Sequence, residues 1–199
     1  MSHYYENDPN LDRTETPFSF EIGGKSFQVM TSAGVFSKDK LDTGTRILCD
    51  YLISPEVVGT LGEEVLDLGC GIGVIGLIVN AFHPCKITGI DPNAQACHLA
   101  KENYALHHVD ATVLEQDHVD DKVYDTVTLN PPIRAGKEVI YALFRQSYEH
   151  LKEGGVLYIV IRKQHGAQSA VSFLESLGFA VDRPEREKGF WILRARKNG

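Results

Sequence analysis

Alternating apolar and polar residues near the start of the chain predict a β-hairpin. Phe18–Ile22 and Lys25–Met30 each place an apolar residue at every second position, as a strand with one buried face does. Gly23-Gly24 separates the two runs, and a glycine pair suits the tight turn of a hairpin. Further along, apolar residues spaced three to four apart predict a helix from Arg46 to Leu52.

From Val65 onward, strand-like and helix-like patterns alternate. Short runs rich in β-branched residues predict strands, and longer runs with helical apolar spacing predict helices. The predicted strands are Val65–Leu68, Lys86–Ile90, Ala111–Glu115, Tyr124–Leu129, Val156–Ile161, Phe179–Val181 and Phe190–Arg194. The predicted helices are Val74–Phe82, Asn93–His107, Lys137–Leu151 and His165–Leu177, with Gly154-Gly155 stopping the third and Gly178 the fourth.

This order of elements predicts an α/β fold. Strand–helix–strand units build a parallel sheet with helices on both faces. A charged loop and no helix separates the last two predicted strands, so we expect them to pair antiparallel at one edge. We expect one structural domain overall, in which residues 1–60 form an N-terminal arm, hairpin and helix packed on a core of residues 61–199.

Composition and charge narrow the functional classes. The chain is 43% hydrophobic and 24% charged, as is usual for a globular protein. It has no apolar run of the roughly 20 residues that a membrane span needs, and it begins with a polar, acidic segment. We therefore expect a cytoplasmic protein. The cysteines form no C-x-x-C pair, and adjacent His107 and His108 diverge on a helix, so no metal site is predicted.

The net charge of −7 argues mildly against nucleic-acid binding, which needs a basic surface. Net charge does not report where the basic residues lie, however. They gather in three places, which are either solvated surface runs or parts of a binding face: Arg134 with Lys137, Arg162 with Lys163, and Arg194 with Arg196 and Lys197.

A glycine-rich turn follows the first strand of the core. Gly69, Gly71 and Gly73 alternate directly before a predicted helix, and such a turn lets a ligand approach the backbone and the free N–H groups of the helix N-terminus. This pattern is typical of nucleotide-type ligands. Gly71, Gly73 and Gly76 also fit the dinucleotide fingerprint, with Asp91 at the spacing of a ribose contact.

Carboxylates stand at the ends of three predicted strands, where ligands of open α/β sheets bind. Asp91 has the chemistry to accept two hydrogen bonds from a ribose diol, or to cap the following helix. Asp117 has the chemistry to accept from an adenine amine, or is a loop acid. Asp67 comes too early to reach deep into a ligand, and we expect it to hold the glycine turn or to meet the ligand's ammonium group through water.

The stretch Asn130-Pro131-Pro132-Ile133 follows the fourth strand of the core. Two prolines remove two N–H donors and stiffen the turn. The Asn130 side-chain oxygen and the Pro131 carbonyl are then two acceptors directed at one point. They suit an amino group conjugated to a ring, whose orientation they would set for attack on a methyl sulfonium.

Together these motifs resemble the class I S-adenosylmethionine-dependent methyltransferases, and within them the small methyltransferase domain group. The resemblance extends to the catalytic domain of the 16S rRNA (guanine-N2)-methyltransferases. The matching stretches are His3–Tyr5, Ala33–Ser37, Leu41–Thr45, Asp67–Gly73, Asp91 and Asn130–Lys137.

The resemblance implies a Rossmann-like, seven-stranded, mostly parallel sheet with an antiparallel last strand. It implies S-adenosyl-L-methionine as cofactor, with Asp91 at the ribose, Asp117 at the adenine and Thr45 near the methionine end. The implied catalytic stretch is Asn130, Pro131, Pro132 and Ile133. The implied cofactor-binding set is Thr45, Asp67, Gly69, Cys70, Gly71, Gly73, Asp91, Pro92, Asp117 and Asn130.

The chain departs from this family in two respects. Ile133 stands where many amine-methylating relatives have an aromatic residue, so a base platform must come from elsewhere, and Phe36 is the candidate ahead of Tyr4 or Tyr5. The rRNA enzymes also carry a second, N-terminal domain. Recognition of RNA is therefore expected from the N-terminal arm, from Arg134 and Lys137, or from a dimer partner.

The leading hypothesis is methylation of guanine N2 in small-subunit rRNA, either naked or in the assembled subunit, by a monomer or homodimer. Adenine N6 and a protein glutamine amide are chemically similar nucleophiles and remain alternatives. Two further alternatives are an NAD-dependent oxidoreductase, which the glycine fingerprint allows, and a non-catalytic RNA-binding module.

Overall fold

The N-terminal hairpin lies on the outer side of the helices that cover one face of the molecule. The computed structural model describes residues 14–33 and 41–198; Tyr4, Tyr5 and Phe36 lie outside these ranges. Strands β1 (Thr16–Ile22) and β2 (Lys25–Thr31) pair antiparallel, as predicted. Both turn glycines, Gly23 and Gly24, have positive φ, which the tight connection requires.

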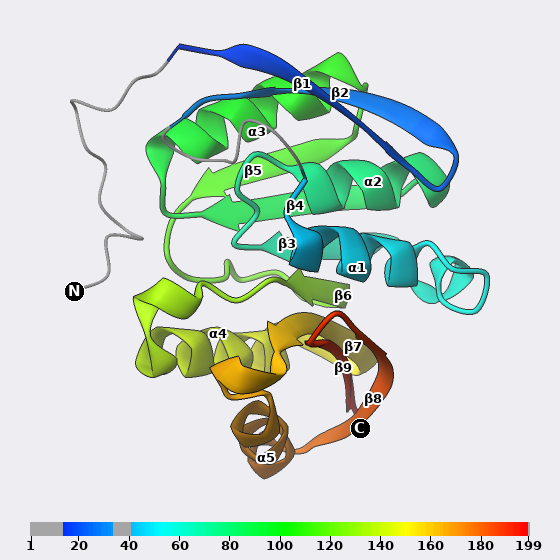
Figure 1. Ribbon diagram of the computed structural model, residues 1–199. Helices are drawn as coiled ribbons and strands as arrows, with labels where there is room; N and C mark the ends of the chain where they lie inside the picture. Colours follow the sequence, from blue (N-terminus) through cyan, green and yellow to red (C-terminus); the bar gives the residue numbers. More distant parts are fainter. Residues whose placement is uncertain (1–13, 34–40, 199) are drawn as a thin grey trace.

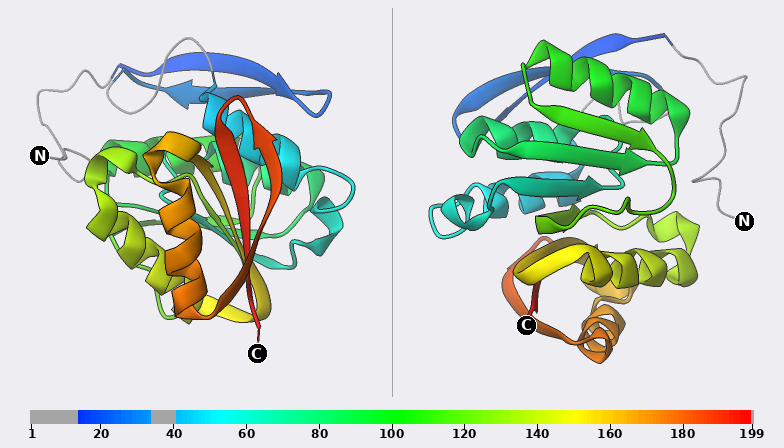
Figure 2. Two further views of the ribbon diagram at one scale, coloured as in Figure 1. Left: turned by 60° about the horizontal axis from the view of Figure 1, so that its bottom comes forward. Right: turned by 180° about the vertical axis from the view of Figure 1, so that it is seen from behind.

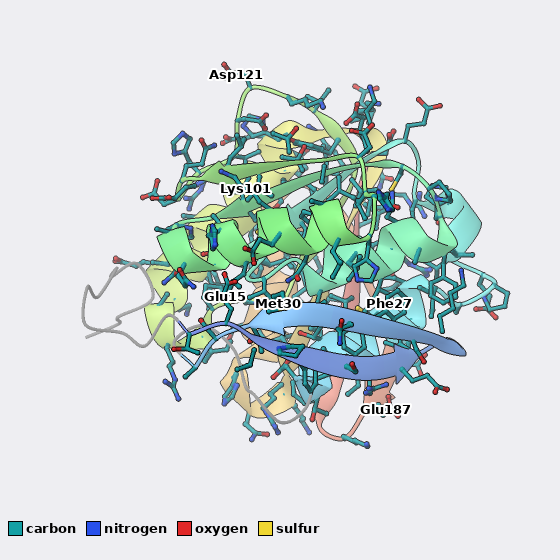
Figure 3. All side chains as sticks on the ribbon, turned by 90° about the horizontal axis from the view of Figure 1, so that it is seen from above. Glu15, Phe27, Met30, Lys101, Asp121 and Glu187 are labelled. Atoms are coloured by element: carbon teal, nitrogen blue, oxygen red, sulfur yellow. The ribbon has the colours of Figure 1, made fainter. Side chains whose placement is uncertain are left out.

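The hairpin lies along helix α3 (Ala94–Leu106), as Figures 1 and 3 show, and hydrogen bonds join the two. The Asn103 side chain accepts from the Met30 N–H at 2.7 Å and donates to the Met30 carbonyl at 3.1 Å. His107 Nε2 lies 2.7 Å from the Gln28 carbonyl. Buried aromatic residues of the hairpin belong to the same hydrophobic core as the sheet, while the division of the chain at residue 60 stays a prediction.

The central sheet has seven strands in the order β5-β4-β3-β6-β7-β9-β8. Strands β3 to β7 run parallel, and β9 lies antiparallel between β7 and β8. This confirms the predicted fold class, including the antiparallel end. The strands are β3 (Glu64–Leu68), β4 (Lys86–Asp91), β5 (Ala111–Glu115), β6 (Tyr124–Leu129), β7 (Leu151–Arg162), β8 (Phe179–Glu187) and β9 (Phe190–Lys197).

Helices cover both faces of the sheet (Figures 1 and 2). One core lies between the sheet and α1 (Thr43–Leu52), α2 (Val74–Phe82) and α3. The second lies under α4 (Lys137–His150) and α5 (Ala167–Leu177). Because successive strand residues face opposite sides, β7 contributes Tyr158 to the first core and Ile159 to the second.

Several predicted boundaries differ from those in the structure, and strand pairing explains two of the differences, at the end of α4 and in β8. Helix α4 ends at His150, before Gly154-Gly155, because buried Leu151 turns extended and pairs with Tyr124 of β6. The helix predicted from His165 is split: a 3-10 turn (Lys163–His165) and Gly166, with φ of +89°, precede α5.

The charged segment predicted as a loop belongs to β8, which continues to Glu187. As an edge strand it pairs with β9 on one side and meets solvent on the other, so charged side chains and Pro184 are tolerated there. The Arg183 guanidinium lies 4.1 Å from the centre of the Trp191 ring. The turn back into β9 contains Lys188 and Gly189, both with positive φ.

Close packing of α2 on α3 predicts the effect of one substitution. A Cβ on Gly76 would lie 2.4 Å from the Tyr104 hydroxyl and 2.8 Å from Ile87 Cγ2. We expect Gly76→Ala to lower the free energy of unfolding by about 2 kcal/mol through overpacking, and Tyr104→Phe in the same chain to restore part of it. Urea unfolding measures both. Gly59→Ala, which meets open space, is the control, and an equal loss in both alanine variants would contradict the packing explanation.

Candidate active site

The glycine turn between β3 and α2 is anchored to the neighbouring strand. The N–H groups of Gly69 and Cys70 both donate to the Ile90 carbonyl, at 2.8 and 2.9 Å. Gly69, Gly71 and Gly73 all have positive φ. A Cβ on Gly71 would meet nothing within 4 Å, so the backbone of the turn borders open space, as a nucleoside cradle requires.

Asp91, at the end of β4, holds this turn in place. Its Oδ2 accepts the Gly71 N–H and its Oδ1 accepts the Asn93 N–H, each at 2.9 Å, and the residue is buried. A carboxylate at this position has the chemistry to accept a hydrogen bond from a ribose hydroxyl, as predicted. The N-cap residue of α3 is Asn93, whose side chain accepts the Ala96 N–H.

Asp67, in β3, contacts the start of the helix that follows the glycine turn. Its Oδ2 accepts the Gly76 N–H at 3.1 Å, in the first turn of α2, whereas Oδ1 has no hydrogen-bond partner among the described residues. Burial raises the pKa of Asp67 to about 7; the Gly76 N–H opposes this rise, and the nearby Asp91 carboxylate adds to it. The observed contact of Asp67 is with the helix that follows the glycine turn, and its predicted role in holding the turn itself stays a prediction.

The raised pKa of Asp67 predicts how stability depends on pH. The folded protein retains a proton that the unfolded chain loses above the ordinary pKa of 3.8, so the contribution of Asp67 to stability falls as pH rises from about 4 to 7. We expect Asp67→Asn, which does not titrate, to gain ~2–4 kcal/mol relative to wild type between pH 4.5 and 8. Urea unfolding without cofactor measures this difference; parallel pH profiles would contradict it.

A pocket opens beside the cradle at the carboxyl ends of the strands. It is lined by Leu68, Gly69, Ile90, Pro92, Gln116, Asp117 and Leu143. Apolar walls with one carboxylate at the rim fit an adenine ring, for which Asp117 was predicted as a partner. The Asp117 side chain is 69% exposed and lies 3.2 Å from His118 Nδ1. The Cys70 side chain is buried near Gly89, so Cys70 contributes to the glycine turn through its backbone and not through its thiol.

Asn130, at the end of β6, is held by two residues at the start of α1. Its Nδ2 donates to Asp42 Oδ2 and to Thr45 Oγ1, both at 3.1 Å. Both amide hydrogens are therefore used, and Oδ1 is left as the acceptor for a ligand. Asp42 Oδ2 also accepts the Thr45 N–H at 2.9 Å and so caps α1. Thr45, predicted near the methionine end of the cofactor, thus lies beside Asn130.

A second pocket begins at Asn130. It is lined by Asp42, Thr43, Asn130, Ile133, Val160, Ile161, Arg162, His165 and Phe190. Pro131 is buried, and Ile133 is 37% exposed. The Arg162 guanidinium lies 4.4 Å from the centre of the Phe190 ring. An aromatic ring therefore does line this pocket, although it comes from β9 and not from the motif after β6.

Sequence reasoning missed Asp42, Arg162 and Phe190 as site residues. The antiparallel pairing of β7 and β9 sets Phe190 opposite Arg162, a juxtaposition that no local pattern reveals. Asp42 had a detectable signal, because an aspartate directly before a helical run is a typical N-cap. Phe36, the predicted base platform, lies outside the described residues.

The three basic groups do not share one face. Arg134 and Lys137 follow the Asn130 turn and are exposed, and Arg162 and Lys163 end β7 at the same edge of the sheet. In the register of β7 and β9, Arg196 pairs with Val156 and so lies farther from the carboxyl end of β7 than Arg162 does. Lys197 donates to the carbonyls of Tyr148 and Leu151 and Arg194 is paired with Asp182, which gives this third group a structural role.

Comparison with known proteins identifies the family. The family model "Methyltransferase small domain" matches residues 26–194. "Uncharacterized protein YbxB" of Bacillus subtilis is 38% identical over 98% of both chains. Ribosomal RNA small subunit methyltransferase C of Pseudomonas entomophila is 30% identical over 98% of this chain and 58% of its own length. Ribosomal RNA large subunit methyltransferase G of Pseudomonas putida is 32% identical over 91% and 49%. The chain spans about half the length of these two rRNA relatives.

Solved structures agree with the observed fold. The T. thermophilus 16S rRNA N2 G1207 methyltransferase, in complex with AdoMet and guanosine, superposes with a TM-score of 0.80 at 23% identity, over 96% of this chain and 52% of its own. No described helix is long and apolar enough to cross a membrane. The chain belongs to the methyltransferase small domain family, a class I group that uses S-adenosylmethionine as its cofactor.

Proposed function

We propose that this protein transfers a methyl group to the exocyclic N2 amine of guanine in small-subunit ribosomal RNA. The observation that carries the proposal is the fixed amide of Asn130, whose hydrogens are held by Asp42 and Thr45 and whose oxygen is left to accept. The rRNA methyltransferases among the relatives support RNA as the substrate class.

The bound cofactor supplies an electrophilic methyl group, and the residues of the chain place the nucleophile. Asn130 Oδ1 and the Pro131 carbonyl accept the two amine hydrogens, which orients the nitrogen lone pair out of conjugation with the ring. S-adenosylmethionine, which the Gly69–Gly73 turn and Asp91 would hold, would give its methyl group to the amine and leave as S-adenosylhomocysteine, and the amine would lose one proton to solvent. No strong base is required, because the positively charged methylated amine is acidic.

RNA must present an unstacked base to this pocket, since the amine of a paired guanine is not accessible. The apolar side chain of Ile133 and the ring of Phe190 line the pocket, where they suit contact with the base. Arg134, Lys137 and Lys163 are exposed on the same edge of the sheet and are placed to contact phosphates. This local distribution reconciles RNA binding with the net charge of −7.

Methyl transfer from labelled S-adenosylmethionine tests the proposal. Naked small-subunit rRNA, assembled small subunits and assembled large subunits are offered separately, and the labelled nucleoside is identified by mass analysis. We expect N2-methylguanosine from a small-subunit substrate. Detection of N6-methyladenosine or of a methylated glutamine would show that one of the alternative acceptors, and not guanine N2, is the substrate. Cofactor binding without transfer to any RNA would overturn the proposal of an RNA substrate.

The NAD-dependent alternative does not agree with the family assignment. The same cradle holds Gly76 close against Tyr104 of α3, which explains the third glycine of the fingerprint by helix packing. The non-catalytic alternative fails if the transfer assay gives any methylated product that depends on Asn130.

A further inference from the structure

Asp42 presents one free carboxylate oxygen beside Asn130. Its Oδ2 accepts two hydrogen bonds, from the Thr45 N–H and from Asn130 Nδ2. Within residues 14–33 and 41–198, Oδ1 receives no hydrogen bond. Asp42 lines the pocket that begins at Asn130 and is exposed, so Oδ1 is the oxygen that remains for a ligand there.

The polar groups of this pocket form a pattern that can be compared with the edges of the bases. Asn130 Oδ1 and Asp42 Oδ1 are neighbouring acceptors, and the Arg162 guanidinium is a donor in the same lining. Guanine presents complementary groups along its Watson–Crick edge: the N2 amine donates, N1–H donates and O6 accepts. Adenine has an acceptor at N1, and a glutamine amide has a carbonyl beside its amine, so each would place a lone pair against the Asp42 carboxylate.

We propose that Asp42 is the residue that selects guanine, by accepting its N1–H while the adjacent amine is held at Asn130. This inference rests on the proposed function and adds the reason for which guanine is chosen over adenine and over a glutamine side chain. The two bonds to Asp42 Oδ2 also make it a positioning residue for the Asn130 amide.

The isosteric variant Asp42→Asn tests the role of the free carboxylate oxygen, Oδ1, without removing the side chain. The asparagine oxygen can keep both bonds that Oδ2 accepts, and asparagine is an equally good helix cap. The change then converts the free acceptor into a donor. Asp50→Asn is the matched control, because Asp50 is an exposed aspartate of the same helix that does not line the pocket.

The affinities of two nucleosides show whether a donor or an acceptor of the protein faces N1 of the base. Guanosine and 2-aminopurine riboside share the 2-amine, but 2-aminopurine has an acceptor at N1. The fluorescence of 2-aminopurine riboside gives its affinity in the presence of S-adenosylhomocysteine, and displacement gives that of guanosine. We expect wild type and Asp50→Asn to prefer guanosine by about tenfold or more, and Asp42→Asn to lose or reverse that preference, since one specific base contact discriminates by about this factor.

The outcomes separate the two proposals. If wild type prefers guanosine and Asp42→Asn keeps the same ratio, Asp42 is not the selecting residue and the guanine site still stands. If wild type binds neither nucleoside, guanine recognition at this pocket fails and takes the role of Asp42 with it. If Asp42→Asn does not fold, Asp42→Ser replaces it: serine retains the cap without a carboxylate, and an unchanged preference in that variant overturns the inference.

Discussion

Replacement of Asn130 by alanine is expected to lower the single-turnover rate of methyl transfer by about 10³-fold. In the proposed function the side chain removed is one of the two acceptors that orient the target amine, and loss of one preorganised polar group of this kind costs about 10²–10³ in rate. Asn130 is also in the implied cofactor-binding set, but the cradle at Gly69–Gly73 does not involve its side chain, so we expect the affinity for S-adenosylmethionine to fall by less than about tenfold, far less than the rate.

Single-turnover transfer from labelled cofactor to the RNA substrate measures the rate, and calorimetric titration measures cofactor affinity. Asn80→Ala is the control, because the Asn80 side chain donates to the Cys85 carbonyl at the far end of α2. A fall in rate of less than tenfold for Asn130→Ala would show that this amide does not orient the nucleophile.

Replacement of Asp91 by alanine is expected to weaken cofactor binding by about 100-fold or more. The carboxylate holds the Gly71 and Asn93 N–H groups, and buried hydrogen bonds to a charged acceptor contribute about 1.5–3 kcal/mol each. The variant loses the bond that shapes the glycine turn and, with it, the acceptor proposed for the ribose. One hundredfold in affinity corresponds to about 2.7 kcal/mol, which is within the reach of these two bonds.

Calorimetric titration with S-adenosylhomocysteine measures the Asp91 effect directly. Asp117→Ala is the matched control: its side chain is 69% exposed and competes with water for any adenine contact, so we expect a loss of less than about tenfold. Equal losses in the two variants would indicate that Asp91 has no special place in the cradle. Thermal unfolding without ligand separates a loss of affinity from a loss of folded protein.

Most of the strands and helices were predictable from local patterns. Helix α2 has the predicted bounds, Val74–Phe82, and β6 has the predicted bounds, Tyr124–Leu129. Each is decided by its own apolar spacing and by the turn that follows it. The segments that were wrong depend on a partner elsewhere in the chain, as the extension of β8 to Glu187 depends on β9.

The residues of the candidate site also fall into two groups, those predictable from the local sequence and those that depend on partners far away in the chain. Gly69–Gly73, Asp91 and Asn130 were identified from the sequence because each directly follows a buried strand, and the carboxyl ends of parallel strands meet at one edge. Asp42 reaches Asn130 across 88 positions of sequence, and Phe190 reaches Arg162 through an antiparallel pairing. The basic residues looked alike in the sequence, yet the register of β9 carries Arg196 and Lys197 away from that edge.

The sequence by itself determined the α/β fold, the glycine cradle and the family chemistry, because these follow from short-range patterns and from glycine, proline and carboxylate positions at strand ends. The tertiary structure alone decided which groups surround the Asn130 amide and which of its atoms is left to accept. The physical reason is that hydrogen-bond partners and pocket walls are set by the packing of α1 and β9 against β6 and β7. Distances between residues far apart in the chain are fixed by folding and leave no periodic mark on the sequence.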